Sequence, residues 1–149
     1  MTARIFVDTN IHVYAFDTSN KAKAWVAVAL LDQIGEARSG MMSAQVLSEF
    51  FNTVTRKLPQ PLTFIQATAR VEALLQVWTV TPVTELTVLE AIRGVQQYQM
   101  SFWDAQIWAA AKLNQATVLL SEDFQDGAFI EGVRVLNPFR SGFALNQWL

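Results

Sequence analysis

The chain has 149 residues, about half of them apolar, so one domain with a substantial core is expected over residues 1–149. Its formal net charge of -2 argues against a broad basic surface that binds nucleic acid by counterion release, although a bound divalent cation can supply positive charge locally. The absence of cysteine excludes disulfide bonds, thiolate zinc sites and a cysteine nucleophile.

The chain opens with MTARIFVDTN, which lacks the basic segment and long apolar stretch of a signal peptide. The most apolar run, residues 25–31, is too short to span a bilayer. We therefore expect a cytoplasmic protein with no membrane partner.

In the first half of the chain, residues 4–7 form a β-branched and aromatic run that predicts a strand, closed by Asp8-Thr9-Asn10. A helix is expected over residues 22–37, with its apolar face formed by Ala24, Val28, Leu31 and Ile34. A brief strand at 41–42 would then lead to Ser43, which can cap a helix that ends near residue 57.

In the second half, Pro59 and Pro61 separate that helix from another over residues 63–77. The pattern then predicts a strand at 77–82, helices at 84–99 and 101–114, and strands at 117–120 and 132–136. The aromatic tail from residue 138 is expected to be ordered. Strands that alternate with helices favour an α/β fold with a central, mainly parallel sheet flanked by helices.

Three aspartates stand in apolar surroundings. Asp8 follows the first expected strand, and Asp123 comes shortly after the strand at 117–120. Both would lie at carboxyl ends of parallel strands, where α/β sheets bind ligands. Asp104 lies in FWDAQIWAAA, a segment apolar on nearly every side and therefore expected to be buried. A buried carboxylate needs compensation, and a divalent cation is the simplest partner that all three could share.

Each acid also has a purely structural interpretation. Asp8 could cap the next helix, Asp104 could complete a capping box that starts at Ser101, and Asp123 could belong to a surface turn. Glu49 lies at the border of an apolar helix face, where a solvated glutamate is common. His12, in the run IHVYAF, is interpreted as a partly buried structural residue.

The four acids are more specific together than separately. The segment IFVDTN around Asp8, Glu49 in the helix after Ser43, the segment SFWDA around Asp104, and LLSED around Asp123 together resemble a PIN domain. The likeness covers essentially the whole chain in order. It is strongest to the VapC-type toxins of bacterial toxin–antitoxin pairs.

The resemblance implies a metal-dependent ribonuclease. Asp8, Asp104 and Asp123 would gather Mg²⁺ or Mn²⁺, and Glu49 would act on the metal or its water. It further implies that Thr9, Asn10 and Ser121 support the site. Its implied partners are an RNA substrate, a cognate antitoxin and a second copy of the chain in a homodimer.

One departure from the family pattern concerns the last acid, because Glu122 and Asp126 flank Asp123. Ser121 matches the family's hydroxyl residue two positions before the acid, which favours Asp123, with Glu122 or Asp126 as a substitute or an addition. Two other functions stay open: a PIN scaffold that binds RNA or a protein without cutting, and a phosphatase like the haloacid dehalogenases. The latter family places a second acid two residues after the first, where this chain has Asn10.

The predicted chemistry matches these residue types. Hydrolysis of a phosphodiester needs an activated water and relief of negative charge on the phosphate, and hard divalent ions provide both. Such ions prefer carboxylate oxygens to imidazole or sulfur. Carboxylates clustered without a cation would raise one another's pKa values, so cation binding should also stabilise the fold.

Overall fold

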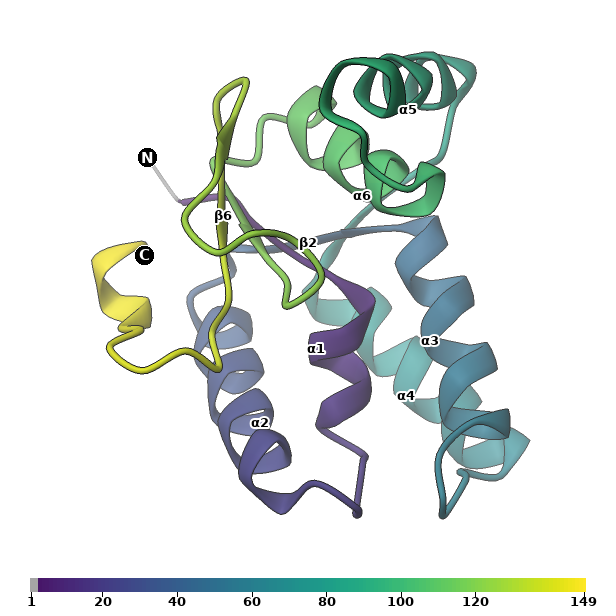
Figure 1. The fold of residues 1–149 in the computed structure, drawn as a ribbon. Helices are drawn as coiled ribbons and strands as arrows, with labels where there is room; N and C mark the ends of the chain where they lie inside the picture. The colour runs from purple at the N-terminus through teal and green to yellow at the C-terminus, as the bar shows by residue number, and fades with distance from the viewer. Residues whose placement is uncertain (1–2) are drawn as a thin grey trace.

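The computed structural model describes residues 3–149. Its elements alternate between strands and helices along most of the chain (Figure 1). They are, in order, β1 (Ile5–Val7), α1 (Thr9–Tyr14), α2 (Lys21–Glu36), β2 (Gly40–Ser43), α3 (Ala44–Arg56), α4 (Phe64–Val77), β3 (Thr79–Thr81), α5 (Glu85–Tyr98), α6 (Phe102–Leu113), β4 (Val118–Leu120), β5 (Phe129–Ile130), β6 (Val133–Leu136) and a 3-10 turn, η1 (Leu145–Gln147).

The strands form one sheet in the order β3-β2-β1-β4-β6-β5. All neighbouring pairs are parallel except β5 and β6, which form an antiparallel hairpin. The predicted α/β class with a mainly parallel sheet is therefore confirmed. The hairpin lies at the sheet edge, where the chain reverses through Glu131 and Gly132, both at positive φ.

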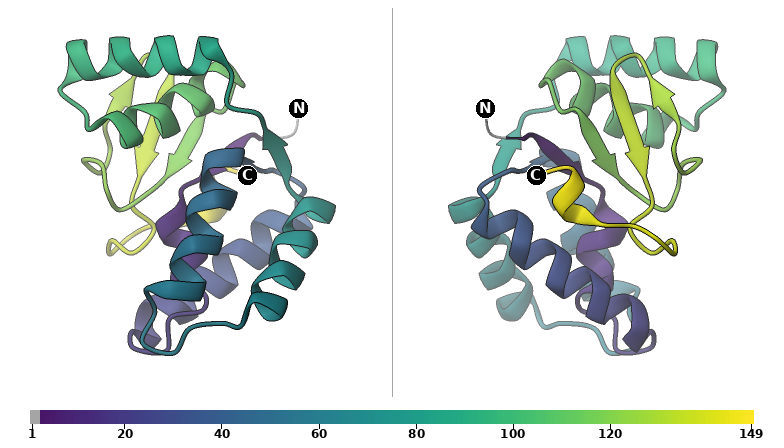
Figure 2. Two further views of the ribbon diagram at one scale, coloured as in Figure 1. Left: turned by 90° about the vertical axis from the view of Figure 1, so that its right-hand side faces the viewer. Right: turned by 90° about the vertical axis from the view of Figure 1, so that its left-hand side faces the viewer.

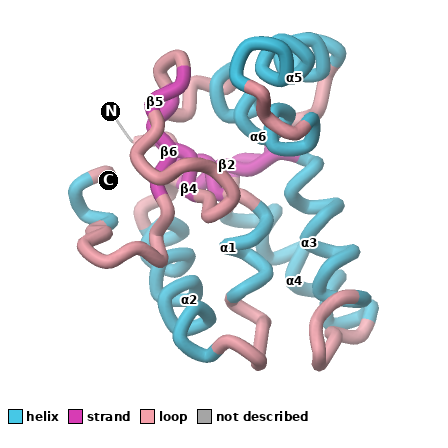
Figure 3. Tube along the Cα trace, in the orientation of Figure 1, coloured by secondary structure: helices cyan, strands magenta, loops and turns pink. Residues whose placement is uncertain are grey.

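The sheet separates two helical layers. Figure 2 shows α5 and α6 on one side and α1, α2, α3 and α4 on the other, and the tube in Figure 3 shows the short strands enclosed between them. α5 packs closely on α6 because Gly94 has no side chain: a Cβ there would lie 2.9 Å from the Trp108 ring. β1 and β4 are buried throughout, as expected for central strands covered on both faces.

Two elements were not predicted from the sequence, and one helix face was predicted wrongly. α1 and β5 are missing from the sequence prediction, and both are short. In α2 the buried residues are Ala27, Leu30 and Ile34, whereas Val28 is 45% exposed. The apolar surface of α2 is therefore wider than a single buried stripe.

The capping prediction for Ser43 was wrong in its chemistry. Ser43 does precede α3, but it is also the last residue of β2, and its buried hydroxyl has no hydrogen-bond partner. The tail is ordered as predicted, with Leu145 of η1 only 7% exposed. Within residues 3–149, no helix is both long enough and apolar enough to cross a bilayer.

The register of the two central strands positions the site. Val7 of β1 pairs with Leu120 of β4, and the Asp8 amide donates to the Leu120 carbonyl over 3.0 Å. The residues that follow these strands, Asp8 and Ser121, therefore emerge side by side. The start of α3 follows β2 at the same edge of the sheet, since β2 runs parallel to β1.

Candidate carboxylate site

One cavity of about 340 Å³ collects the predicted acids from four separate parts of the chain. Asp8, Glu49, Asp104 and Asp123 all line it, together with Thr9, Asn10 and Asp17. Among residues 3–149, no lysine or arginine lines this cavity. The structure thus brings together acids that lie up to 115 residues apart in sequence.

Asp8 is the buried centre of the cavity, at 3% exposure. Its Oδ1 accepts from the Thr9 amide at the start of α1 over 2.7 Å, and its Oδ2 accepts from the Ser121 hydroxyl over 2.7 Å. Asp8 therefore does cap α1, and it lines the cavity as well. The structural and functional interpretations of this residue are compatible.

Burial raises the pKa of Asp8 from 3.8 to about 7. Hydrogen bonds from Ser121 and the Thr9 amide lower the pKa, whereas the charges of Asp123 and Glu49 raise it further. Desolvation is the largest of these effects. A cation in the cavity would favour the ionised carboxylate and reverse the shift.

Two polar side chains connect Asp8 with Asp123. The Asn10 amide nitrogen donates to Asp123 Oδ2 over 2.9 Å and to Asp8 Oδ2 over 3.3 Å. The Ser121 hydroxyl, which donates to Asp8, accepts from the Asp123 amide over 3.1 Å. The buried Thr9 hydroxyl and Asn10 side-chain oxygen have no hydrogen-bond partner among residues 3–149.

Asp104 stands in the first turn of α6 and is partly buried. The Ser101 hydroxyl caps α6 by accepting from the Asp104 amide over 3.3 Å, but the return bond to the Asp104 side chain that would complete the predicted capping box does not occur among residues 3–149. Burial raises the pKa of Asp104, the Ser101 hydroxyl lowers it, and the charge of Asp123 raises it again. Asp123 thus acts electrostatically on both Asp8 and Asp104, which places the three aspartates in one electrostatic cluster.

Glu49 enters the cavity from α3, one of the helices on the opposite side of the sheet from α6. Its Oε1 accepts from the amide nitrogen of Gln45, one turn earlier, over 2.6 Å. Gln45 is 9% exposed and was not singled out from the sequence. A lone glutamine at helical spacing from a glutamate gives no distinctive signal.

The structure separates Asp123 from the two acids that flank it. Glu122 pairs with Lys23 over 2.6 Å and also hydrogen-bonds the Tyr14 hydroxyl. Asp126 accepts from the Asn137 amide over 2.8 Å, which closes the turn before β5. Neither lines the cavity, so neither takes the place of Asp123. Asp17, which does line it, was missed because its sequence context signals only a turn.

The donor set suits a hard divalent cation. Apart from Tyr14, every ionisable residue that lines the cavity carries a carboxylate, the ligand that Mg²⁺ and Mn²⁺ prefer. Across residues 3–149, no group of three or more histidine, aspartate or glutamate side chains is close enough together to hold a metal ion. A cation shared by Asp8, Asp104 and Asp123 would therefore be held in part through water, as Mg²⁺ can be.

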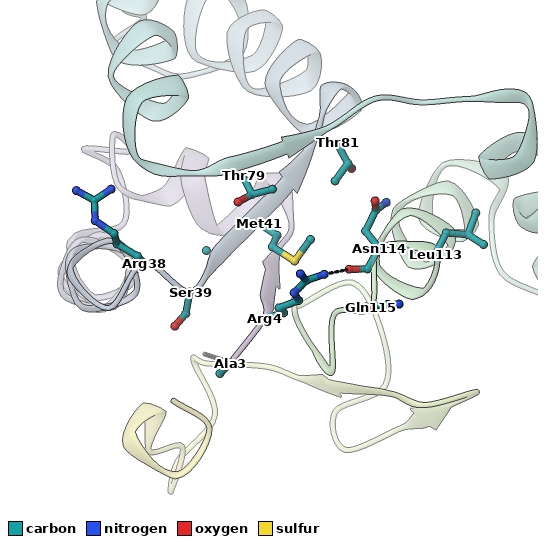
Figure 4. A pocket seen from close by; sticks show the side chains of 11 residues that line it. Ala3, Arg4, Arg38, Ser39, Met41, Thr79, Thr81, Leu113, Asn114 and Gln115 are labelled. Carbon is teal, nitrogen blue, oxygen red and sulfur yellow. Dashed lines mark hydrogen bonds between the residues drawn. The ribbon is translucent and has the colours of Figure 1, made fainter. Parts of the chain in front are cut away.

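The other cavities lie elsewhere. One of about 530 Å³, at the start of β1 and β2, is lined by Arg4, Ser39 and Thr79, and Arg4 donates to the Asn114 carbonyl over 3.1 Å (Figure 4). His12 lines a cavity of about 720 Å³ between α2 and α4. It was predicted to be partly buried and is fully buried, and burial lowers its pKa to about 3, so it is neutral near pH 7.

A fourth cavity, of about 970 Å³, adjoins the His12 cavity, with which it shares Phe16, Val28 and Asp32. Together they form a surface groove, named here the α2–α4 groove. Trp25, at 81% exposure, lies in it. The groove reaches the carboxylate cavity, because Asp17 lines both.

Comparison with known proteins gives one family and several similar structures. The sequence profile described as the PIN domain matches residues 5–126, which include all four acids. No curated protein sequence matches the chain.

The similar structures share the fold at low sequence identity. The VapC20 toxin of Mycobacterium tuberculosis, described as cleaving the sarcin–ricin loop, is 22% identical, with a TM-score of 0.66 over 87% of this chain and 98% of that one. A toxin–antitoxin complex from Klebsiella pneumoniae is 20% identical, with a TM-score of 0.64 over 92% and 98%. DNA-bound VapBC from Salmonella typhimurium is 14% identical, with a TM-score of 0.62 over 89% and 96%.

Proposed function

The chain belongs to the PIN-domain family, and on that premise we propose that it is a divalent-metal-dependent endoribonuclease, the toxin of a type II toxin–antitoxin pair. The observation that carries the proposal is the cavity in which four carboxylates meet without a lysine or arginine among its lining residues in the described chain. Structural similarity to VapC proteins supports the toxin assignment. We further propose that the protein acts in the cytoplasm, where an antitoxin and cellular RNA would meet it.

Each acid has a proposed role. Asp8, Asp104 and Asp123 hold Mg²⁺ or Mn²⁺, and Glu49 holds or orients a water beside them. When bound, the cation supplies an activated water and neutralises charge on the scissile phosphate. Thr9, Asn10 and Ser121 keep Asp8 and Asp123 in position, as their hydrogen bonds indicate.

Trp103 is the proposed contact for a nucleobase. It lines the carboxylate cavity, precedes Asp104 directly and is 65% exposed. Its ring packs edge-on against Phe102 with centroids 5.1 Å apart, which limits its freedom while one face stays accessible. An unpaired base can stack on such a ring whatever its identity, so this contact favours single-stranded or looped RNA.

The α2–α4 groove is the proposed binding site of the antitoxin. It is lined largely by apolar side chains, and large exposed apolar surfaces mark binding sites for other proteins. Because Asp17 belongs to both the groove and the carboxylate cavity, a segment along the groove can extend toward the acids. A basic side chain on that segment would pair with the carboxylates and compete with the cation.

The large aromatic side chains differ in exposure. Phe50, Trp78 and Trp108 are buried, whereas Trp103 is exposed at the carboxylate cavity. In the groove, Trp25 of α2 is exposed. The proposed antitoxin site therefore depends on α2.

A homodimer is proposed through α5. Leu86, Leu89 and Ile92 recur every three residues along this helix and are 69%, 62% and 42% exposed. A convex apolar helix face can pair with its own copy about a two-fold axis, unlike a concave groove. Light scattering on wild type and on Leu89→Lys decides between dimer and monomer.

The test of the nuclease proposal is incubation of purified protein with structured and single-stranded RNA, with Mg²⁺, with Mn²⁺ or with EDTA. Cleavage is expected only with metal, and Asp8→Asn is expected to abolish it. RNA or partner binding without cleavage under all conditions would instead identify a non-catalytic PIN scaffold.

A further inference from the structure

Two buried glutamines form a hydrogen-bonded chain that ends on Glu49. The Gln106 amide nitrogen donates to Gln45 Oε1 over 2.8 Å, and the Gln45 amide nitrogen donates to Glu49 Oε1 over 2.6 Å. Gln106 lies on α6 and is 6% exposed, and Gln45 lies on α3 and is 9% exposed. Glutamine is usually exposed, so two such residues buried in contact require an explanation.

The same Gln45 nitrogen also donates to the Trp103 carbonyl over 3.2 Å. That carbonyl belongs to the peptide bond that leads into Asp104. Gln45 therefore contacts the side chain of one acid and the backbone directly before another. Both amide hydrogens and one oxygen of its side chain are occupied, which is nearly the full capacity of an amide.

We propose that Gln45 and Gln106 are positioning residues that orient Glu49, and secondarily Asp104, toward the cation and water of the carboxylate site. The inference rests on the proposed nuclease function. Neither glutamine lines the cavity, so neither touches substrate or cation directly. Their effect is transmitted through Glu49.

Two acceptors set the direction of the chain. An amide can present either its oxygen or its nitrogen to a neighbour, and the two orientations are similar in shape. The Trp103 carbonyl and the Glu49 carboxylate only accept, so the Gln45 nitrogen must face them, and its oxygen is left to accept from Gln106. In the opposite orientation an oxygen would face the Glu49 carboxylate and repel it. By donating to the Gln45 oxygen, Gln106 stabilises this orientation and so supports a carboxylate that it does not contact.

The arrangement also leaves one Glu49 oxygen, Oε2, to contact a cation or a water. Oε1 is held by Gln45, and no hydrogen bond to Oε2 occurs among the described residues. A side chain fixed through one oxygen has a defined direction for the other. Hydrogen-bond partners that orient metal-site ligands commonly change metal affinity or activity by about 10- to 100-fold when they are removed.

The test compares Gln45→Met and Gln106→Met, which keep the length and approximate volume of glutamine but lack its hydrogen bonds. Gln33→Met, at an exposed position of α2, is the matched control. We expect kcat for RNA cleavage to fall by about 10- to 100-fold in the two variants and KM to stay nearly constant. The control should match wild type.

A double-mutant cycle with Glu49→Gln distinguishes positioning from general destabilisation. If the glutamines act through Glu49, then Gln45→Met will change kcat strongly in wild type and by less than about twofold in the Glu49→Gln protein. Independent, multiplicative effects in the two backgrounds would overturn the proposal. Thermal unfolding of every variant shows whether each protein is folded at the assay temperature.

A measurement without catalysis separates this inference from the proposed function. Calorimetric titration of each protein with Mn²⁺ should show weaker binding, by about 10-fold or more, for Gln45→Met and Gln106→Met than for Gln33→Met. Unchanged Mn²⁺ affinity together with unchanged kcat refutes the positioning role while RNA cleavage by wild type still supports the nuclease. If wild type cleaves no RNA, the nuclease proposal fails, and the Mn²⁺ affinities still decide whether the glutamines position the site.

Discussion

The buried carboxyl of Asp8 gives a sharp prediction about stability in metal-free buffer. Its pKa is raised to about 7 in the folded protein, chiefly by burial, from an ordinary value of 3.8. Between these two pH values the folded state keeps a proton that the unfolded state has released. The free energy of unfolding contributed by Asp8 therefore falls as pH rises, by about 1.4 kcal/mol per pH unit and about 4 kcal/mol in total.

His12 masks this effect in the wild-type pH profile. Burial lowers its pKa from 6.5 to about 3, so between these values the unfolded state binds a proton that the folded state does not. The contribution of His12 to the free energy of unfolding therefore rises with pH. It does so over almost the same pH range in which the contribution of Asp8 falls. The wild-type profile alone should be nearly flat, and only a difference between variants isolates Asp8.

The appropriate perturbation is Asp8→Asn. Asparagine keeps an oxygen that can accept from the Thr9 amide but loses the second acceptor, which costs roughly 1–3 kcal/mol at every pH. Relative to wild type, the variant should nevertheless gain about 3 kcal/mol in unfolding free energy between pH 4.5 and pH 8. Urea denaturation at half-unit pH steps, followed by tryptophan fluorescence, measures this difference.

A control variant and a measurement with Mn²⁺ complete this experiment. Asp32→Asn, which removes an exposed carboxylate on α2, is the matched control. At pH 8, Mn²⁺ at 100 times its dissociation constant should stabilise wild type by about 2.7 kcal/mol and leave Asp8→Asn nearly unchanged. A pH-independent difference for Asp8→Asn would refute the argument that this carboxyl occupies a desolvated site.

Three further predictions concern the cation, the substrate and the partner. Asp104→Asn should reduce the rise in melting temperature caused by Mn²⁺, and an identical rise in wild type and variant would count against Asp104 as a ligand. In the inactive Asp8→Asn background, Trp103→Ala should weaken binding of single-stranded RNA by about 1–3 kcal/mol, measured by fluorescence anisotropy, whereas Trp103→Phe should keep most of the affinity. Val28→Asp, in the α2–α4 groove, should prevent the co-expressed antitoxin from co-purifying without changing RNA cleavage. If the complex stays intact, the groove is not the antitoxin binding site.

The sheet and its acids could be predicted because they depend on local patterns and on topology. Short apolar runs that end in Asp8 and shortly before Asp123 mark buried strands and their carboxyl ends. Parallel pairing then brings those ends to one edge. The strands β1 and β4 are indeed neighbours, so one topological rule accounts for the meeting of Asp8 and Asp123.

The unpredicted elements have little local signal. α1 has only six residues, and its β-branched and aromatic members do not favour a helix, so its formation depends on packing against α2 and α3. β5 has two residues and exists because it pairs with β6. The error over the face of α2 has another cause: Val28 is apolar yet exposed, and periodicity alone assigns such a residue to the core.

The supporting network of the site could not be predicted from spacing. Gln45 and Gln106 are 61 residues apart, and their contact depends on how α3 and α6 approach each other. Similarly, LLSEDFQD does not reveal which acid faces the cavity. That choice follows from Lys23 and Tyr14, which bind Glu122, and from the Asn137 amide, which binds Asp126.

The central claim is that Asp8, Glu49, Asp104 and Asp123 act as one cation site for RNA cleavage. The most direct measurement compares Asp123→Asn with Glu122→Gln, two neutralising changes at adjacent positions, in an RNA cleavage assay with Mn²⁺. We predict that Asp123→Asn loses cleavage by at least about 100-fold, since losing a ligand weakens the binding of a cation that supplies several kcal/mol of charge stabilisation. Glu122→Gln should cleave within about threefold of wild type, because its side chain lies outside the cavity and can still accept from Lys23. Equal loss in both variants, or full activity in Asp123→Asn, would contradict the account.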